Sequence, residues 1–273
     1  MSKLNFSYAS KIEHNFAQRL IIKTIEHVTG KKKLEKLYNE YALANKTPET
    51  FWSDILKVMN IGVINKSKNE IIIPKKGPLM VIANHPFGII DGLILCSIVS
   101  KQRDDFKIMT HETLKFLPQL EKYILPVDFS GTDQKTVKYN LKTASNAKKH
   151  LKDGGVLIIF PSGSVSVAKS LRSEAHDDEW KTFPAKLAHQ TESGILPIYF
   201  DGKNGLLFHI FASKLKSSTL KYSSYIHETR KKIGENIDIY PGKVIEYSFI
   251  SHMKDRNKLI KFLKDETYNL KFQ

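Results

Sequence analysis

The stretch ANHPFGIIDG, residues 83–92, lies in the most apolar segment of the chain. Apolar residues lead into it at positions 79, 81 and 82 and leave it at positions 93 to 95. An imidazole and a carboxylate, His85 and Asp91, nevertheless stand within it, beside a proline and two glycines. Burying such groups costs free energy unless they are paired, so their presence in this segment needs an explanation.

The segment predicts a buried strand, a tight turn and a helix. The strand over residues 78–84 ends at the histidine, because Pro86 cannot donate to a ladder and restricts the residue before it. Gly88 gives the turn conformational freedom and leaves room for a substrate. A helix over 89–100 then carries Asp91 in its first turn, where the helix dipole favours a carboxylate. This spacing predicts that Asp91 folds back towards the imidazole.

Short apolar runs and helical patterns alternate through the rest of the chain. We expect further strands at 106–110, 124–129, 154–160, 194–200 and 236–245, and further helices at 112–122, 133–152, 220–233 and 254–269. Nearly all-apolar strands that alternate with helices predict an α/β fold. The expected architecture is a mixed, mostly parallel central sheet covered by helices on both faces.

Helical patterns also precede the first strand, over residues 11–28, 34–44 and 51–59. We therefore expect an N-terminal helical subdomain, residues 1–60, packed on an α/β domain, residues 61–273. The length of 273 residues suits this single-domain organisation. The apolar stripe of the first helix fits either a protein core or a membrane surface, and the sequence leaves both open.

The net charge of +15 comes almost entirely from lysine. Such a charge favours anionic partners: nucleic acid, an anionic lipid surface or an acidic carrier protein. No run of 18 apolar residues is present, and the N-terminus lacks the apolar centre of a signal peptide. The single cysteine, Cys96, excludes an internal disulfide framework, and we expect it to be a small core residue in a reducing compartment.

A histidine that contacts a carboxylate is suited to general base catalysis. The carboxylate fixes the tautomer and stabilises the imidazolium, so the second ring nitrogen can remove a proton from a hydroxyl or an amine. The sequence therefore predicts a catalytic pair, His85 and Asp91. A histidine with a purely structural hydrogen bond at a strand end is the alternative.

Two more predicted strands end in polar residues, and parallel strand ends meet at one edge of a sheet. The run GGVLIIFPSGSVS, residues 154–166, places Ser162, Gly163 and Ser164 in a turn. Backbone N–H groups and hydroxyls at such a turn suit a phosphate or a developing oxyanion, although a simple polar loop is equally consistent. The run YFDGKNG, residues 199–205, offers Lys203 and Asn204 to an anionic head group.

These blocks resemble the glycerolipid (lysophospholipid) acyltransferase superfamily, and most closely its bacterial branch often labelled hemolysin. The NHPFG and DG residues of 84–92 resemble the signature block, and FPSGSVS resembles the second block. Residues 178–188 and ILPIYFDGKNGLLF resemble the branch's later blocks. The resemblance covers roughly residues 20–247 in order.

The resemblance implies that His85 deprotonates an acceptor hydroxyl, which attacks the thioester of acyl-CoA or acyl-carrier protein, with Asp91 as its partner. It also implies a set of substrate-binding residues: Asn84, Phe87, Gly88, Ser162, Gly163, Ser164, Lys203 and Asn204. No metal, no cofactor and no acyl-enzyme are implied.

The chain departs from its relatives at three places. Five residues separate the histidine from the aspartate, where the better-known lysophosphatidate enzymes have four. Ser162 and Ser164 stand where relatives often carry glutamate. The arginine that relatives use to hold a phosphate is not evident near ILPVDFSGT, which offers Asp128 and Ser130. These departures weaken the case for a phosphate-bearing acceptor and leave an amino-acid-derived lipid or another single-chain lipid as an alternative.

Three other functions remain as alternatives. Ser164, flanked by small residues after a strand, loosely matches the nucleophile elbow of a serine esterase or lipase. A nucleic-acid binder would use the lysines, but gives no reason for the His85 and Asp91 pair. A non-catalytic lipid binder is the third. A pore is not expected, because the apolar runs are too short.

The sequence thus predicts a lipid acyltransferase that transfers a fatty acyl group to a hydroxyl or an amine. We expect it in the cytoplasm, peripheral on the inner face of the cytoplasmic membrane, where lysines meet anionic lipid. Its expected partners are an acidic acyl donor, a lipid acceptor and the anionic membrane surface, with no specific nucleic acid.

Overall fold

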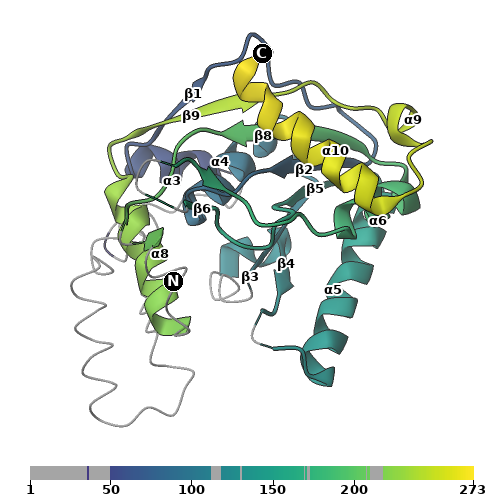
Figure 1. The fold of residues 1–273 in the computed structure, drawn as a ribbon, viewed down its shortest axis with the longest axis horizontal. Helices are drawn as coiled ribbons and strands as arrows, with labels where there is room; N and C mark the ends of the chain where they lie inside the picture. The colour runs from purple at the N-terminus through teal and green to yellow at the C-terminus, as the bar shows by residue number, and fades with distance from the viewer. Residues whose placement is uncertain are drawn as a thin grey trace.

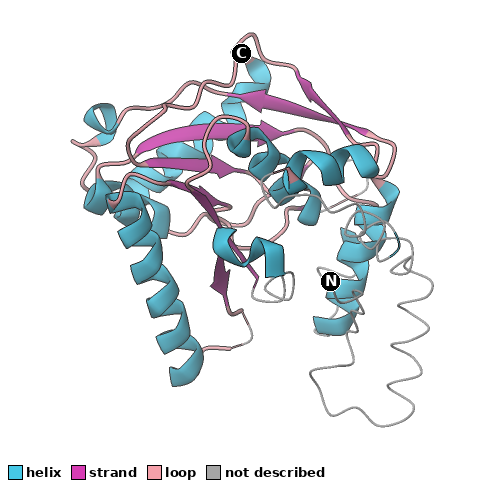
Figure 2. Ribbon diagram, turned by 180° about the vertical axis from the view of Figure 1, so that it is seen from behind, coloured by secondary structure: helices cyan, strands magenta, loops and turns pink. Residues whose placement is uncertain are grey.

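The computed structural model describes residues 50–111, 118–129, 131–168, 173–206 and 218–273, with residues 36, 170, 208 and 209. A twisted sheet lies at the centre, with helices on both of its sides (Figure 1). The same layers are visible from behind (Figure 2). Apart from Lys36, the residues expected to form the first two helices lie outside the described ranges, so the N-terminal subdomain stays a prediction.

The central sheet has seven strands in the order β1-β9-β8-β2-β5-β3-β4. Their bounds are Gly62–Asn65 (β1), Leu79–Ala83 (β2), Phe106–His111 (β3), Ile124–Val127 (β4), Val156–Ile159 (β5), Gly194–Phe200 (β8) and Asn236–Pro241 (β9). All neighbouring strands run parallel except β8 and β9, which are antiparallel. The expected mixed, mostly parallel α/β sheet is confirmed.

The helices divide between the two faces of this sheet. They are α3 (Phe51–Val58), α4 (Ile89–Ser100), α5 (Gln134–Lys152), α6 (Phe183–Thr191), α8 (Ser218–Lys231), α9 (Tyr247–Ile250) and α10 (Arg256–Asn269). One buried cluster joins the sheet to α3 and α4, and a second joins it to α5, α6 and α10. In Figure 1, α10 crosses in front of the sheet while α3 and α4 lie behind it.

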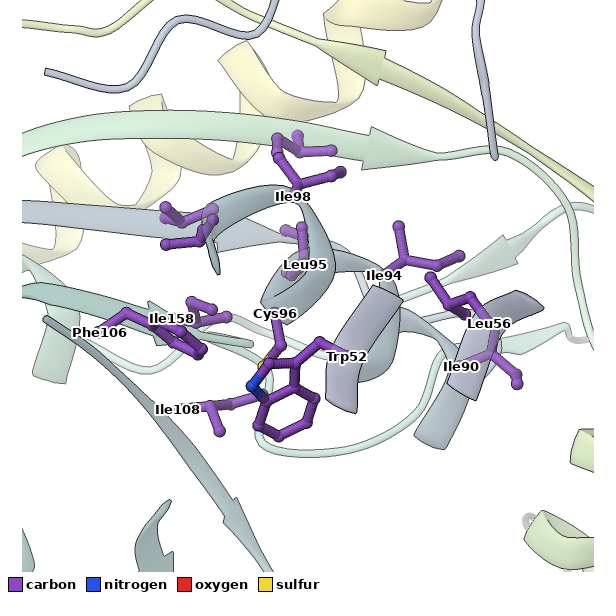
Figure 3. Packing of buried hydrophobic residues seen from close by; sticks show 14 of the residues in the cluster. Trp52, Leu56, Ile90, Ile94, Leu95, Cys96, Ile98, Phe106, Ile108 and Ile158 are labelled. Atoms are coloured by element: carbon purple, nitrogen blue, oxygen red, sulfur yellow. The ribbon is translucent and has the colours of Figure 1, made fainter. Parts of the chain in front are cut away.

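Strand β2 shows why its sequence is apolar at every position. Leu79, Val81 and Ala83 pack into the first cluster, whereas Met80 and Ile82 pack into the second. A strand covered on both faces has no solvent-facing side, so the alternation of apolar and polar residues disappears. Cys96 packs inside the first cluster among the residues in Figure 3, as expected for a core cysteine.

The observed bounds differ from the expected ones mainly near short elements. A helix was expected at 112–122; its described end is a 3-10 helix, Pro118–Tyr123. The strand expected over 236–245 ends at Pro241, and only Ile245 adds an isolated bridge to Ile195. Strand β1, α6 and the hairpin of β6 (Val167–Ala168) and β7 (Ala175–His176) were not anticipated.

None of the helices in the described ranges is both long enough and apolar enough to cross a bilayer.

Candidate active site

Asn84 ties the end of β2 to the neighbouring strand β8. Its side-chain nitrogen donates to the backbone oxygen of Phe200 at 2.9 Å, and its side-chain oxygen accepts from the N–H of Phe200 at 2.7 Å. The side chain is buried. Asn84 therefore fixes the backbone just before the histidine, while direct contact with substrate stays a prediction.

Asp91 closes the first turn of α4. Gly88, which precedes this helix, has φ +72°, a conformation that suits glycine. The Oδ2 atom of Asp91 accepts the backbone N–H groups of Phe87 at 2.9 Å and of Gly88 at 3.0 Å. This is the carboxylate half of a capping box, and it fixes the direction of Oδ2.

The same oxygen meets the histidine. His85 Nδ1 lies 3.0 Å from Asp91 Oδ2, so the contact expected from the spacing is present. Because an ionised carboxylate can only accept, Nδ1 carries the proton and Nε2 keeps its lone pair. No hydrogen bond joins Nε2 to any residue in the described ranges. The His85 side chain is 18% exposed and Asp91 is fully buried.

A second buried carboxylate, Asp177, holds the main chain of the histidine. The N–H of His85 donates to Asp177 Oδ1 at 3.1 Å, and the Ser166 hydroxyl donates to the same oxygen. Trp180 Nε1 donates to Oδ2 at 2.8 Å, and the Ser166 N–H donates to the carbonyl of His85 at 2.9 Å. The backbone of His85 is thus bound on both sides.

Sequence reasoning missed Asp177, Ser166 and Trp180 as supporting residues. Trp180 and Ser166 lie inside blocks that carry the family resemblance, which was the available signal. Asp177 lies beside the quoted blocks and is held in turn by α10: its N–H donates to the Tyr268 hydroxyl at 2.9 Å, and Lys264 donates to its carbonyl at 3.1 Å.

Phe160 fixes the plane of the imidazole. The two rings stack with centroids 3.8 Å apart and an interplanar angle of 21°. Phe160 directly follows β5, and His85 follows the end of β2. Because β5 and β2 are parallel neighbours, the two rings lie at the same edge of the sheet. Phe160 precedes Pro161 in the sequence, but no sequence pattern predicts that its ring stacks on His85.

Burial dominates the ionisation of both carboxyl groups. Desolvation raises the pKa of Asp91, and the hydrogen bond with His85 acts in the opposite direction. Desolvation likewise raises the pKa of Asp177, against the hydrogen bonds from Ser166 and Trp180. The hydrogen bonds from His85, Phe87 and Gly88 therefore offset part of the cost of burying the Asp91 carboxylate.

The turn expected at Ser162, Gly163 and Ser164 follows β5 and lies close to His85 through Phe160 and Ser166. Gly163 has φ +70° and its N–H donates to the carbonyl of Phe160 at 3.0 Å. Ser162 Oγ donates to the carbonyl of Ser164 at 2.7 Å. These bonds shape the turn, and a contact of its residues with substrate stays a prediction.

Ser164 does not have the surroundings of a serine nucleophile. Its hydroxyl donates to Asp178 Oδ2 at 3.1 Å. A catalytic serine needs a base as its hydrogen-bond partner, usually histidine, and none of the histidines in the described ranges hydrogen bonds to Ser164. This geometry disfavours the serine esterase alternative.

The third polar strand end lies against the first. A Cβ atom on Gly202 would come within 2.7 Å of the ring of Phe87, so the two turns touch. Lys203 Nζ donates to the carbonyl of Ser173 at 2.7 Å. Asn204 is 3% exposed. The sequence-predicted residues at all three strand ends therefore gather at one edge of the sheet.

In the part of the chain that the structure describes, no three His, Cys, Asp or Glu side chains are grouped in a way that would bind a metal ion.

Comparison with known proteins adds a family match, two relatives and one solved structure. A family model described as Acyltransferase matches residues 64–201, a range that contains His85, Asp91 and the Ser162–Ser164 turn. A lyso-glycine lipid O-acyltransferase of Phocaeicola vulgatus is 22% identical over 264 residues, covering 94% of this chain and 90% of its own. A second protein of that description, from Bacteroides thetaiotaomicron, is 24% identical over 204 residues, covering 72% of each chain.

Among solved structures, the chain is similar to the 1-acyl-sn-glycerophosphate (LPA) acyltransferase PlsC of Thermotoga maritima. The TM-score is 0.49 at 16% sequence identity, with 83% of this chain and 79% of that chain covered.

Proposed function

This chain belongs to the acyltransferase family, and on that premise we propose that it transfers a fatty acyl group from an acyl thioester to the hydroxyl of a lipid acceptor. It is an O-acyltransferase of lipid metabolism, like the two curated relatives. The observation that supports the proposed mechanism best is the His85–Asp91 contact, which leaves Nε2 as an unoccupied base.

In the proposed reaction, His85 Nε2 removes the proton of the acceptor hydroxyl as its oxygen attacks the thioester carbonyl carbon. The tetrahedral intermediate collapses and breaks the C–S bond, and the thiolate of the donor leaves with the proton that the imidazolium returns. Asp91 stabilises the imidazolium in between. Every atom and proton is accounted for without an acyl-enzyme or a cofactor.

We propose an amino-acid-derived, single-chain lipid as the acceptor. The end of β4 offers Asp128 and Phe129, so the phosphate-binding arginine of phospholipid-acylating relatives has no counterpart there. Both curated relatives carry the name of a lyso-glycine lipid enzyme. For the donor, acyl-carrier protein and acyl-CoA are both acidic, which suits a chain with net charge +15.

We further propose that the enzyme works at the inner face of the cytoplasmic membrane. Phe129, Val137 and Leu141 are large apolar side chains that are 46% to 64% exposed. Phe129 lies beside the site, because a Cβ on Gly163 would be 3.7 Å from its ring. The other two lie one helical turn apart in the first half of α5, among lysines. Helix α5 projects from the sheet (Figure 1). Apolar residues flanked by lysines suit an anionic lipid surface.

The direct test is incubation of the purified protein with an isotope-labelled acyl donor and a panel of acceptors, followed by mass detection of the products. The panel contains an N-(β-hydroxyacyl)glycine, an ornithine analogue, lysophosphatidate and lysophosphatidylethanolamine, each with acyl-CoA and with acyl-carrier protein. We expect ester formation on the hydroxyl of an amino-acid lipid. Acylation of lysophosphatidate alone would contradict the proposed acceptor, and no acylation of any acceptor would contradict the function.

A further inference from the structure

Asn204 is a buried amide that has no hydrogen-bond partner among the residues that the structure describes. Its residue is 3% exposed, and within the described part of the chain neither its carboxamide oxygen nor its nitrogen has a hydrogen bond. A buried polar group left unpaired is less stable than the same group in water, because it loses its hydrogen bonds with water and gains none. Native structures contain few such groups, and each calls for an explanation. One explanation is a ligand that forms the missing hydrogen bonds with the carboxamide.

The position of Asn204 beside the catalytic turn supports a ligand. It follows β8, whose end is bonded to the end of β2 through Asn84 and Phe200. The intervening Gly202 has φ +122° and lies against the ring of Phe87. The loop of Asn204 therefore packs directly on the residues between His85 and Asp91.

A second connection reaches the histidine from the other side. His209 Nε2 lies 3.0 Å from the carbonyl of Asn204, and its Nδ1 accepts the N–H of Ala168 at 3.1 Å. Ala168 is two residues beyond Ser166, whose N–H binds the carbonyl of His85. His209 thus connects the backbone of Asn204 to the segment that holds the catalytic residue.

Hydrogen bonds from its neighbours hold the backbone of this loop, and within the described residues the Asn204 side chain makes none of them. Lys203 Nζ binds the carbonyl of Ser173 at 2.7 Å, and the N–H of Gly205 donates to the buried Glu228 at 2.6 Å. The loop therefore needs nothing from the carboxamide to keep its shape. A polar group that is held in place and has no structural bond is suited to recognising a substrate.

The chemistry of a carboxamide selects the ligand. It offers one acceptor and one donor side by side, and its complement is a molecule with a donor and an acceptor in the same spacing. An N-acylated amino acid has this arrangement, because its N–H and its carboxylate oxygen point to one side when the residue is extended. A phosphate ester has acceptors only.

We propose that Asn204 binds the amino-acid part of the acceptor, its side-chain oxygen accepting the amide N–H and its side-chain nitrogen donating to the carboxylate. Asn204 would thereby select N-acylated amino acids over glycerol-based lysolipids. This inference rests on the proposed function and makes it more specific.

The test compares two acceptors and three proteins. The acceptors are an N-(β-hydroxyacyl)glycine and its ester analogue, in which oxygen replaces the amide N–H and nothing else changes. In the wild type we expect kcat/KM to favour the amide by on the order of 10- to 100-fold, the effect of leaving a buried acceptor unpaired. In Asn204→Leu the two acceptors should react within about threefold of each other, because the leucine makes no hydrogen bond with either acceptor.

Asn146→Leu, the same change at an exposed position of α5, is the matched control and should keep the amide preference. Thermal unfolding separates folding from recognition: Asn204→Leu should be at least as stable as wild type, since it removes an unpaired buried amide. Asn204→Ala provides a second variant with the same expected loss of preference.

Three results would overturn the inference: no amide preference in the wild type, a preference that survives in both Asn204 variants, or an equal loss of both acceptors with a lowered unfolding temperature. In each of these the wild type still acylates an acceptor, so the proposed function stands. A wild type that acylates neither acceptor in this pair nor any in the wider panel would overturn both.

Discussion

The backbone N–H of His85 donates to Oδ1 of Asp177 at 3.1 Å across 92 residues of sequence. The imidazole is therefore positioned by two acids: Asp91 binds its ring nitrogen and Asp177 binds its main chain. A general base must lie within hydrogen-bond reach of the proton that it removes, so small backbone shifts reduce the rate. Asp177 is a positioning residue in this arrangement.

Replacement of Asp177 by asparagine tests this role. The new amide can keep its oxygen towards His85 and Ser166, but its NH₂ then faces the indole N–H of Trp180, donor against donor. We expect D177N to lower kcat with a smaller change in KM, and to destabilise the fold by about 1–3 kcal/mol. Urea unfolding and steady-state kinetics measure the two effects.

Trp180→Phe supplies the control, because it removes the opposing donor. The double variant should cost less stability than the sum of the two single changes, by about 0.5 kcal/mol or more, since the residues are in contact. Strict additivity would show that the contact between Asp177 and Trp180 does not cause the loss. An unchanged kcat in D177N would show that Asp177 does not position the base.

The proposed roles of His85 and Asp91 predict two different losses. His85→Ala removes the base and should cost on the order of two to four decades in rate. In Asp91→Asn the side-chain oxygen can replace Oδ2 and accept from Phe87, Gly88 and His85 Nδ1, while the NH₂ replaces the buried Oδ1. The histidine would keep its place and its tautomer, but a neutral amide no longer stabilises the imidazolium that forms when Nε2 takes the proton.

For Asp91→Asn we expect a fall in kcat with KM for the acceptor little changed, measured by steady-state kinetics with the labelled donor. Acceptor binding to both variants is followed by calorimetry. If His85→Ala kept wild-type acyl transfer, general base catalysis by this residue would be wrong.

Ser164 distinguishes acyl transfer from hydrolysis. Because its hydroxyl donates to Asp178, we expect Ser164→Ala to reduce the rate only partly. A fluorophosphonate probe, which labels activated serines, should leave no adduct on the wild-type protein by intact mass spectrometry. An adduct that disappears in the alanine variant would support the serine esterase instead.

Cys96 provides a probe of the core beneath the site. It is fully buried in α4, and desolvation raises the pKa of its thiol well above the ordinary value. Since alkylation requires the thiolate, both effects lower its reactivity. We expect almost no labelling by iodoacetamide in the native protein at neutral pH and a single adduct after unfolding, because the chain has one cysteine. Rapid native labelling would show that α4 opens.

The sequence predicted those parts of the molecule whose signals are local. The helix expected at 89–100 coincides with α4, and the contact of His85 with Asp91 spans only six residues. The turn between β2 and α4 contains Pro86 and Gly88, and these two residues marked where the strand ends and the helix begins. The same punctuation at Pro161 and Gly163 located the second turn.

The features that could not be predicted from the sequence depend on contacts between residues far apart in the chain. The strand β1 has two half-buried and two exposed residues, and it forms because it pairs with β9, far along the chain. Residues of β9 alternate between buried and more exposed positions, but this alternation does not show that β9 runs antiparallel to β8. Asp177 binds a backbone N–H, a group that every residue except proline offers, so nothing in the sequence identifies its partner.

The exposed apolar side chains of α5 predict where lipid binds. Val137 and Leu141 are 46% and 64% exposed, and Lys138 and Lys142 follow them on the same helix. Burial of such side chains in lipid contributes roughly 1.5–3 kcal/mol each, so Val137→Glu with Leu141→Glu should lower vesicle binding by tenfold or more. Flotation with phosphatidylglycerol vesicles measures the bound fraction, and neutral vesicles should bind less of every variant.

Ile72→Glu is the control, because Ile72 is 68% exposed and lies outside any helix, and this variant should bind as the wild type does. If the α5 double variant bound as tightly as the control, lipid would meet another surface of the enzyme.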